Sequence, residues 1–203
     1  MRLTTLSLAL LPAAAAAAVA VLGTGGGVQA VEARAGGGGI PADVEVMSND
    51  AYVARYGTEQ AIAQQVPLPS GGGTTAARRS ASDPSIPWHH IYWSALDWDH
   101  NDIPTRRGTD DFGFAHTCTK HNMCTQKAIN APYNGNADRV TGDRAEYDGV
   151  ITSGGSVRMT ITSVAERGGR GPNGRNTPDG RPIGTVTAFC RGQTLCPDWV
   201  NQL

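Results

Sequence analysis

The spacing of hydrophobic side chains changes along this 203-residue chain and predicts different elements in different parts. An apolar run rich in alanine and leucine, from Leu3 to about Leu22, is followed by glycines. Residues 51–65 carry apolar side chains at a loose helical spacing, which predicts one short helix. Around that helix, residues 31–86 are rich in glycine, proline and small polar residues, so we interpret 31–86 as a flexible pro-segment or linker. The alternative is that the helix packs on the domain that follows.

A folded domain is expected from about residue 87 to residue 203, because the composition changes there. Four aromatic residues and a leucine crowd residues 88–98, which is typical of the start of a core. Residues 116–129 follow a helical pattern that Ala131-Pro132 ends, and the apolar side chains of 138–151 predict a second helix.

Two stretches near the C-terminus alternate apolar and polar side chains with a period of two, which predicts β-strands at 157–164 and 183–190. The glycine- and proline-rich residues 166–182 between them predict a long exposed loop. Since the alternation gives each strand one buried face, we expect the two strands to pair antiparallel. The predicted fold class is therefore α+β, with a helical pair that carries the site followed by a small antiparallel β-hairpin.

The N-terminal residues have the features of an export signal. Met1-Arg2 supplies a positive charge ahead of the apolar run, and Val28-Gln29-Ala30 is a small-x-small cleavage pattern. We therefore interpret 1–30 as a signal peptide and expect a secreted chain without stable membrane insertion after cleavage. An uncleaved membrane anchor is the alternative, because the run is long enough to span a bilayer.

Four cysteines in an exported chain imply up to two disulfides, with three connectivities. Cys118 and Cys124 are separated by about 9 Å of rise on a continuous helix, which is beyond disulfide reach. Either the helix breaks between them or each pairs elsewhere. We predict that Cys190 and Cys196 tie the C-terminal segment to this helix. A local Cys190–Cys196 bond is the competing assignment.

The basic residues are unevenly distributed, although the formal net charge is only −1. Six arginines lie between Ser156 and Arg191, against Glu166 and Asp179 as the acidic residues. Such an excess is typical of a solvated loop, or of an anion-binding face for phosphate or an acidic membrane surface.

The candidate chemistry centres on residues 111–124, which hold two of the five histidines, two cysteines and a lysine. A neutral His121 can take a proton from a water molecule that then attacks an ester carbonyl. The acidic loop 97–111 offers oxygen ligands for calcium, and Asp143 or Asp148 can orient the imidazole.

His116 is expected to lie outside this site. It precedes His121 by five helical positions, which places the two side chains about 140° apart around the axis. Lys120 follows His116 by four residues and shares its face, so we interpret that pair as a solvated surface.

One stretch resembles a known family. Cys118-Thr119-Lys120-His121-Asn122-Met123-Cys124 is similar to the Cys-x-x-His-Asp-x-Cys helix of secreted calcium-dependent phospholipases of the A(2) type. Phe112-Gly113-Phe114 is similar to the Phe-Gly-Phe that bacterial and fungal members carry shortly before that helix. The resemblance covers roughly residues 93–148.

The resemblance implies a mechanism as well as a family. His121 would be the general base, Asp143 would orient its ring, and a phospholipid or membrane surface, rather than a nucleic acid, would be the favoured partner. Calcium would assist the hydrolysis. Asn122 stands where the family has a calcium-binding Asp, so one ligand charge is lost. The implied metal ligands are Asn122, Asp99 and Asp102.

Two other functions fit the same residues. A toxin-like, metal-independent ribonuclease would use His116 and His121 as base and acid, with Lys120 or an arginine of 158–191 steadying the phosphorane. Phe112 to His116 is similar to some toxin-type ribonucleases of the barnase-like group. The second function is not enzymatic: a secreted, disulfide-stabilised module would bind a partner through the loop 166–182.

Overall fold

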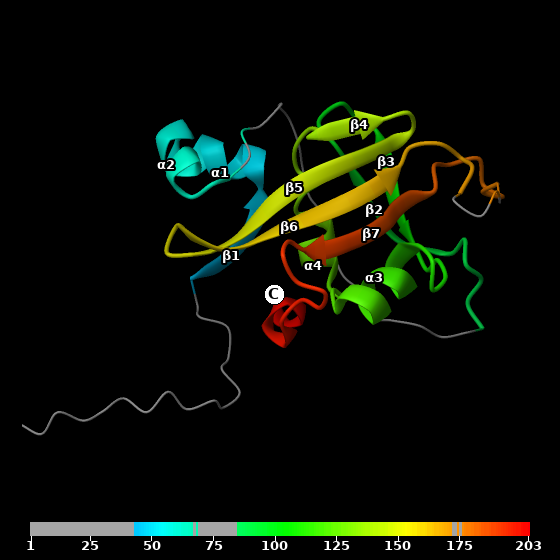
Figure 1. Cartoon of the computed structure of the whole chain (residues 1–203). Helices are drawn as coiled ribbons and strands as arrows, with labels where there is room; N and C mark the ends of the chain where they lie inside the picture. Colours follow the sequence, from blue (N-terminus) through cyan, green and yellow to red (C-terminus); the bar gives the residue numbers. More distant parts are fainter. Residues whose placement is uncertain (1–42, 67, 69–84, 172–173, 175) are drawn as a thin grey trace, which may run out of the picture. The chain divides into compact units, whose positions relative to one another are not determined.

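A five-stranded antiparallel sheet organises the chain (Figure 1). The structure is a computed structural model that describes residues 43–66, 68, 85–171, 174 and 176–203. The elements in chain order are β1 (Val44–Ser48), α1 (Asn49–Tyr56), α2 (Thr58–Ala63), β2 (Ile91–Leu96), β3 (Asp102–Arg106), α3 (Gly113–His121), α4 (Gln126–Asn130), β4 (Arg139–Thr141), β5 (Arg144–Ser153), β6 (Ser156–Glu166), β7 (Gly184–Cys190) and a C-terminal 3-10 helix (Asp198–Gln202).

The main sheet has the strand order β1-β5-β6-β7, and β4 also pairs with β5. β5 and β6 form a long hairpin whose turn is Gly154-Gly155, both with positive φ (57° and 78°). Two successive positive φ values suit glycine and match the twist of the flanking strands. A second sheet consists of β2 and β3.

The two faces of the main sheet are covered by different helices. Tyr147 and Ile151 of β5 belong to the main core, which also contains buried residues of α3, α4 and β2. Val150 points to the opposite face, where it packs with Tyr52 of α1 and Met47 of β1 in a separate cluster. The sheet is therefore buried on both sides along β5.

The predicted helical pair with a small hairpin is wrong as a description of this fold. Strands outnumber helices in the described residues, and the second helix expected at 138–151 is instead β4 and most of β5. A strand buried on both faces has a nearly continuous apolar run, which cannot be distinguished from a buried helix by periodicity. Val150 and Ile151 are adjacent and both fully buried, on opposite faces.

The predicted C-terminal hairpin is present as part of the larger sheet. β6 and β7 pair antiparallel, from Ile161 opposite Cys190 to Glu166 opposite Gly184. This confirms the pairing expected for 157–164 and 183–190.

The segment interpreted as a linker contributes to the fold in its described part. β1 pairs with β5 over its whole length, and α1 and α2 pack on the sheet through Tyr52 and Ala61. Residues 43–66 therefore follow the alternative, in which the helix packs on the domain.

The signal peptide expected at 1–30 lies outside the described residues. None of the helices in the described part of the chain has the length and apolar character required to cross a bilayer.

Two arginine–aspartate ion pairs hold the arginine-rich loop after β6. Arg106 of β3 is fully buried and makes two hydrogen bonds of 2.9 Å to the Asp179 carboxylate. Its guanidinium also donates to the backbone carbonyl of Pro182. Arg181 forms a bidentate pair with Asp102 at 2.7 and 2.8 Å. The end of this loop is thus fixed to β3 rather than solvated throughout.

Candidate functional site

The first feature of the site is the abrupt end of α3. Asn122 adopts a left-handed conformation (φ 51°, ψ 38°), one that Asn tolerates better than most residues. The chain then turns back, and the Met123 amide donates to the Thr117 carbonyl. This reversal brings Cys124 to Cys118, with Cα atoms 4.5 Å apart and a disulfide between them.

The predicted disulfide connectivity is therefore wrong. Cys118 pairs with Cys124, and Cys190 pairs with Cys196, in two local loops of equal length. The prediction assumed a helix without interruption over 116–129, whereas α3 ends at His121 and α4 starts at Gln126. The described chain contains no free cysteine.

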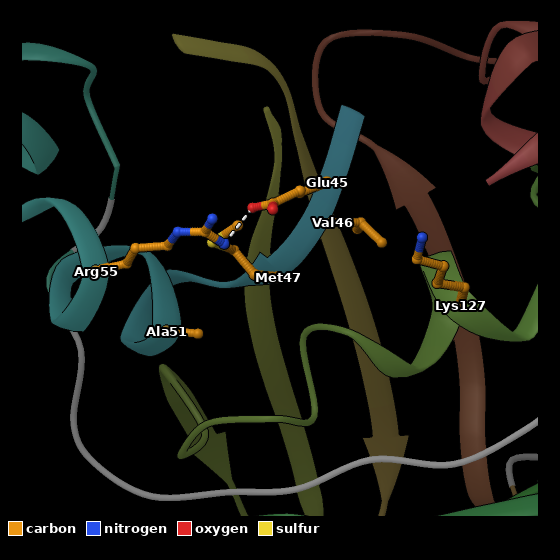
Figure 2. A pocket seen from close by; sticks show the side chains of 6 residues that line it. All are labelled: Glu45, Val46, Met47, Ala51, Arg55 and Lys127. Atoms are coloured by element: carbon orange, nitrogen blue, oxygen red, sulfur yellow. Dashed lines mark hydrogen bonds and ion pairs between the residues drawn. The ribbon is translucent and has the colours of Figure 1, made fainter. Parts of the chain in front are cut away.

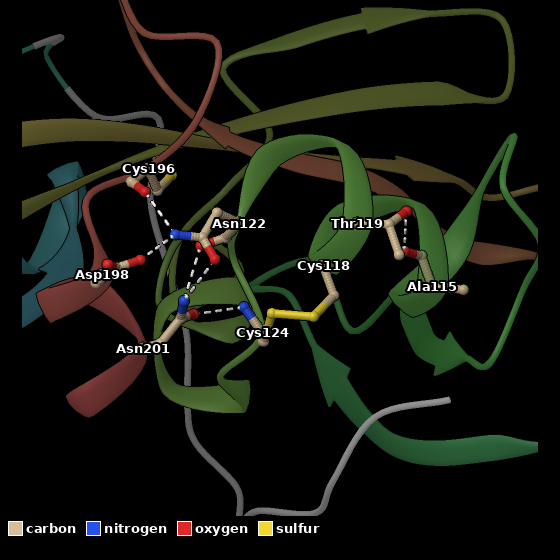
Figure 3. The surroundings of a disulfide bond; sticks show 8 residues. All are labelled: Ala115, Cys118, Thr119, Asn122, Cys124, Cys196, Asp198 and Asn201. Atoms are coloured by element: carbon tan, nitrogen blue, oxygen red, sulfur yellow. Dashed lines mark hydrogen bonds between the residues drawn. A yellow bond between two sulfur atoms is a disulfide. The ribbon is translucent and has the colours of Figure 1, made fainter. Parts of the chain in front are cut away.

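Hydrogen bonds rather than disulfides join the two loops (Figure 3). The Cys196 amide donates to the His121 carbonyl at 2.8 Å. The Asn122 side-chain amide donates to the Cys196 carbonyl and to the Asp198 carboxylate, both at 2.8 Å. Asn201 in turn donates to the Asn122 side-chain oxygen at 3.1 Å. The end of α3 and the C-terminal segment are thereby held as one unit.

His116 and His121 are in contact. Their ring centroids are 5.2 Å apart and the rings are nearly perpendicular, at 73°. The expectation that His116 points away from His121 is wrong. The angle of about 140° refers to Cβ positions around a straight helix, and it does not include the rotamer of a side chain at the end of a helix. His121 is the last residue of α3, and its ring lies against Phe189 of β7 at 5.7 Å. Contacts with the C-terminal part of the chain therefore set its direction.

Backbone carbonyls define the protonation of both rings. His116 Nδ1 lies 2.6 Å from the Asp110 carbonyl oxygen, and His121 Nδ1 lies 3.4 Å from that of Thr194. A carbonyl oxygen only accepts, so each Nδ1 carries the hydrogen and donates it. Each Nε2 is then the nitrogen that can exchange a proton with a substrate. The His121 contact is the longer and weaker of the two.

The surroundings favour a neutral His121. Its pKa is lowered below the ordinary value of 6.5, chiefly because partial burial removes water from the ring. A positive charge on His116 lowers the pKa further, while the hydrogen bond to Thr194 opposes the shift. His121 is therefore neutral near pH 7, and in that form it can accept a proton.

Asp143 lies apart from His121. It sits in the exposed β4–β5 turn, where its carbonyl accepts from the Arg167 amide. Phe189, which contacts His121, is paired with Thr162 of β6. Thr162 and Arg167 are five positions apart, which is about 17 Å along an extended chain. Asp143 is thus not positioned to orient the His121 ring, a role that the Thr194 carbonyl fills.

Two of the three residues expected to bind calcium are engaged by other residues. Asp102 is paired with Arg181, Asp99 is exposed in the turn before β3, and Asn122 is engaged by the C-terminal segment. Within the described ranges there is no group of three or more His, Cys, Asp or Glu side chains arranged to hold a metal ion. Calcium binding stays a prediction.

Asp148, the other candidate for orienting His121, is buried in a network of its own. Its carboxylate accepts two hydrogen bonds of 2.6 Å from Arg191 and one of 2.7 Å from Thr162. A second buried network joins Asp97, Tyr147 and Arg167. Both networks satisfy charges inside the sheet and brace it, and neither includes a histidine.

Sequence reasoning missed the carbonyls of Asp110 and Thr194 and the ring of Phe189. No side-chain pattern reports on a carbonyl that faces a histidine, so nothing in the sequence pointed to the first two. Phe189 precedes Cys190, so a local Cys190–Cys196 disulfide would have placed it near the end of the C-terminal loop.

No family model, curated protein or solved structure matches this chain. A function is therefore inferred from the geometry of these residues.

Proposed function

We propose that this protein is a metal-independent ribonuclease that cleaves single-stranded RNA through the His116–His121 pair. The observation that carries the proposal is the contact of the two rings, whose centroids are 5.2 Å apart. In each ring Nδ1 faces a backbone carbonyl, which leaves Nε2 for the substrate. Transfer of a phosphoryl group from O5′ to the neighbouring O2′ requires one base and one acid, and two imidazoles supply both without a metal.

The proton transfers follow from the different surroundings of the two rings. The Nε2 atom of neutral His121 removes the proton from the ribose 2′-hydroxyl, and O2′ attacks the phosphorus atom. The protonated Nε2 of His116 donates its proton to O5′ as the P–O5′ bond breaks. The products are a 2′,3′-cyclic phosphate and a 5′-hydroxyl, and the two histidines have exchanged protonation states.

Neighbouring side chains suit an RNA substrate. Lys120 is exposed, adjoins His121 and follows His116 by four residues, which places its ammonium on the same side of α3 as His116. There it can stabilise the negative charge of the phosphorane. Phe189 is partly exposed beside His121, and such a ring can stack on a nucleobase.

Hydrolysis of a phospholipid ester by His121 is the second candidate. The Thr194 carbonyl orients the His121 ring in the absence of Asp143, and the lowered pKa suits a general base. This candidate needs a cation or donors for the oxyanion, and it assigns no task to His116. The ribonuclease uses both rings, and for that reason we favour it.

We also propose that the chain is exported. Two disulfides support this, since such bonds form and persist in oxidising compartments. Mass spectrometry of the N-terminus of the mature protein from its natural host tests the expected cleavage after Ala30.

Cleavage of a fluorogenic single-stranded RNA in excess chelator tests the ribonuclease. The purified full chain should cut it, and His116→Asn and His121→Asn should each lower kcat by about a hundredfold or more. The matched control is His100→Asn. His100 is exposed in a turn and has a φ of 62°, a conformation that Asn tolerates, so this variant should keep full activity.

Calcium-dependent release of fatty acid from phospholipid vesicles by the same preparation tests the second candidate. If vesicles are hydrolysed and RNA is not, and His116→Asn is fully active, the ribonuclease proposal fails and the lipase is supported.

A further inference from the structure

β1 is the edge strand of the main sheet. It pairs with β5 on one side, and its other side makes no backbone hydrogen bond to any described residue. In an antiparallel strand, alternate residues direct their N–H and C=O groups away from the partner. Among the residues that the structure describes, nothing pairs with the donors and acceptors on the outer edge of Val44–Ser48, and an extended peptide can recognise such an edge.

This edge lies in a pocket of about 280 Å³ (Figure 2). Three residues of β1, two of α1 and one of α4 line it: Glu45, Val46, Met47, Ala51, Arg55 and Lys127. Figure 2 shows Arg55 and Lys127 on opposite sides of β1. The pocket thus runs along a strand edge between two helices. Its volume is at the low end of the range for ligand sites, about 300–1,000 Å³, so it fits a short segment rather than a domain.

The charges around the pocket favour an acidic ligand. Arg55 is already paired with Glu45 on one wall. Lys127, on the other wall, is exposed and forms no ion pair within the described part of the chain. Among the described residues, Lys127 therefore has no carboxylate partner, and it lies beside the apolar side chains of Val46, Met47 and Ala51. A carboxylate of a ligand placed over Val46 would pair with it.

We propose that the β1 edge binds an extended acidic peptide segment as an additional antiparallel strand. Backbone hydrogen bonds to β1 give the affinity, an apolar side chain rests on Val46 and Ala51, and a glutamate or aspartate of the peptide pairs with Lys127. The pocket residues come from β1, α1 and α4, whereas His116 and His121 belong to α3, so the two sites use different residues.

Fluorescence polarisation with a labelled, end-blocked peptide of sequence Val-Glu-Val-Thr-Val tests the proposal on the full chain. We expect saturable binding that weakens at least tenfold when the glutamate is replaced by lysine. We expect a similar loss when alternate peptide nitrogens are methylated, because methylation removes the hydrogens that a β-ladder requires.

Lys127→Glu should lower the affinity at least tenfold for the acidic peptide and restore binding of the lysine peptide. The control is Arg158→Glu, an equal charge change at an exposed cation outside the pocket, which should bind as the unmodified chain does. Circular dichroism confirms that both variants are folded.

Equal binding of the N-methylated peptide would overturn the proposal, since the pocket would then take a small anion without strand addition. No binding at millimolar peptide would also overturn it. Sedimentation that shows a stable dimer would assign the edge to a second copy of this chain and overturn the peptide as its occupant.

Discussion

Removal of the second disulfide should loosen His121 without destroying the fold. Cys190→Ala/Cys196→Ala opens a loop that carries the Thr194 carbonyl and adjoins Phe189, the two groups that face the His121 ring. Both cysteines are buried, so alanine is preferable to serine, which would bury an unpaired hydroxyl.

The stability cost follows from the loop length. A loop of about seven residues loses roughly 8 cal/mol/K of closure entropy when it is cross-linked in the unfolded chain, or about 2.4 kcal/mol at 25 °C. Cys118→Ala/Cys124→Ala opens a loop with the same sequence separation of six and should cost a similar amount. Urea unfolding followed by tryptophan fluorescence measures both.

The effect on His121 has a definite sign. Burial is the largest cause of its lowered pKa, so a mobile 190–196 loop should admit water and raise the pKa toward 6.5. Loss of the Thr194 hydrogen bond acts in the opposite direction but is the smaller effect. NMR titration of the imidazole C–H signals measures the shift. A His121 pKa that is unchanged or lower in the Cys190→Ala/Cys196→Ala variant would refute the assignment of burial to this loop.

Three further changes test other parts of the structure. Asn122→Asp should lower the free energy of unfolding in urea by about 1–3 kcal/mol, because a carboxylate would replace the side-chain amide that donates to Asp198. A more stable variant would contradict the observed network. Arg106→Met should cost about 1–3 kcal/mol in the same assay, because it removes the buried donor to two backbone carbonyls and to the exposed Asp179 carboxylate. A neutral effect would show that Arg106 does not hold the loop. The acid limb of the pH–rate profile for RNA cleavage should lie below pH 6.5, because the lowered pKa keeps His121 neutral there; an acid limb above 6.5 would exclude His121 as the base. The free energy of unfolding should decline with falling pH between the His121 pKa and 6.5, because only the unfolded chain binds the additional proton in that range.

The strands near the C-terminus were predictable because their sequences alternate apolar and polar side chains. β6 and β7 alternate clearly enough for the pairing of 157–164 with 183–190 to be expected from the sequence. β5 was not predictable in the same way, since Val150 and Ile151 enter two different cores and remove the alternation. β1 is only five residues long and lies in a segment of linker-like composition, so nothing local distinguished it.

The site was predictable as a region but not as a geometry. The clustering of histidines and cysteines at 111–124 directed attention to the end of α3 where the two histidine rings meet. The left-handed Asn122 decided the disulfides, and a single residue in that conformation leaves no periodic trace. The approach of His116 to His121 depends on Phe189 and Thr194, which are about 70 residues away in sequence and reach the helix only through tertiary packing.

The most direct test of the central claim is the rate of RNA cleavage in chelator by the unmodified chain, His116→Asn, His121→Asn and the double variant. If the two rings act together as acid and base, each single variant should lose about a hundredfold or more. The double variant should then be only slightly slower than either single variant, because groups that act as a unit are not additive. Full activity of His116→Asn, or no RNA cleavage by the unmodified chain, would contradict a catalytic histidine pair.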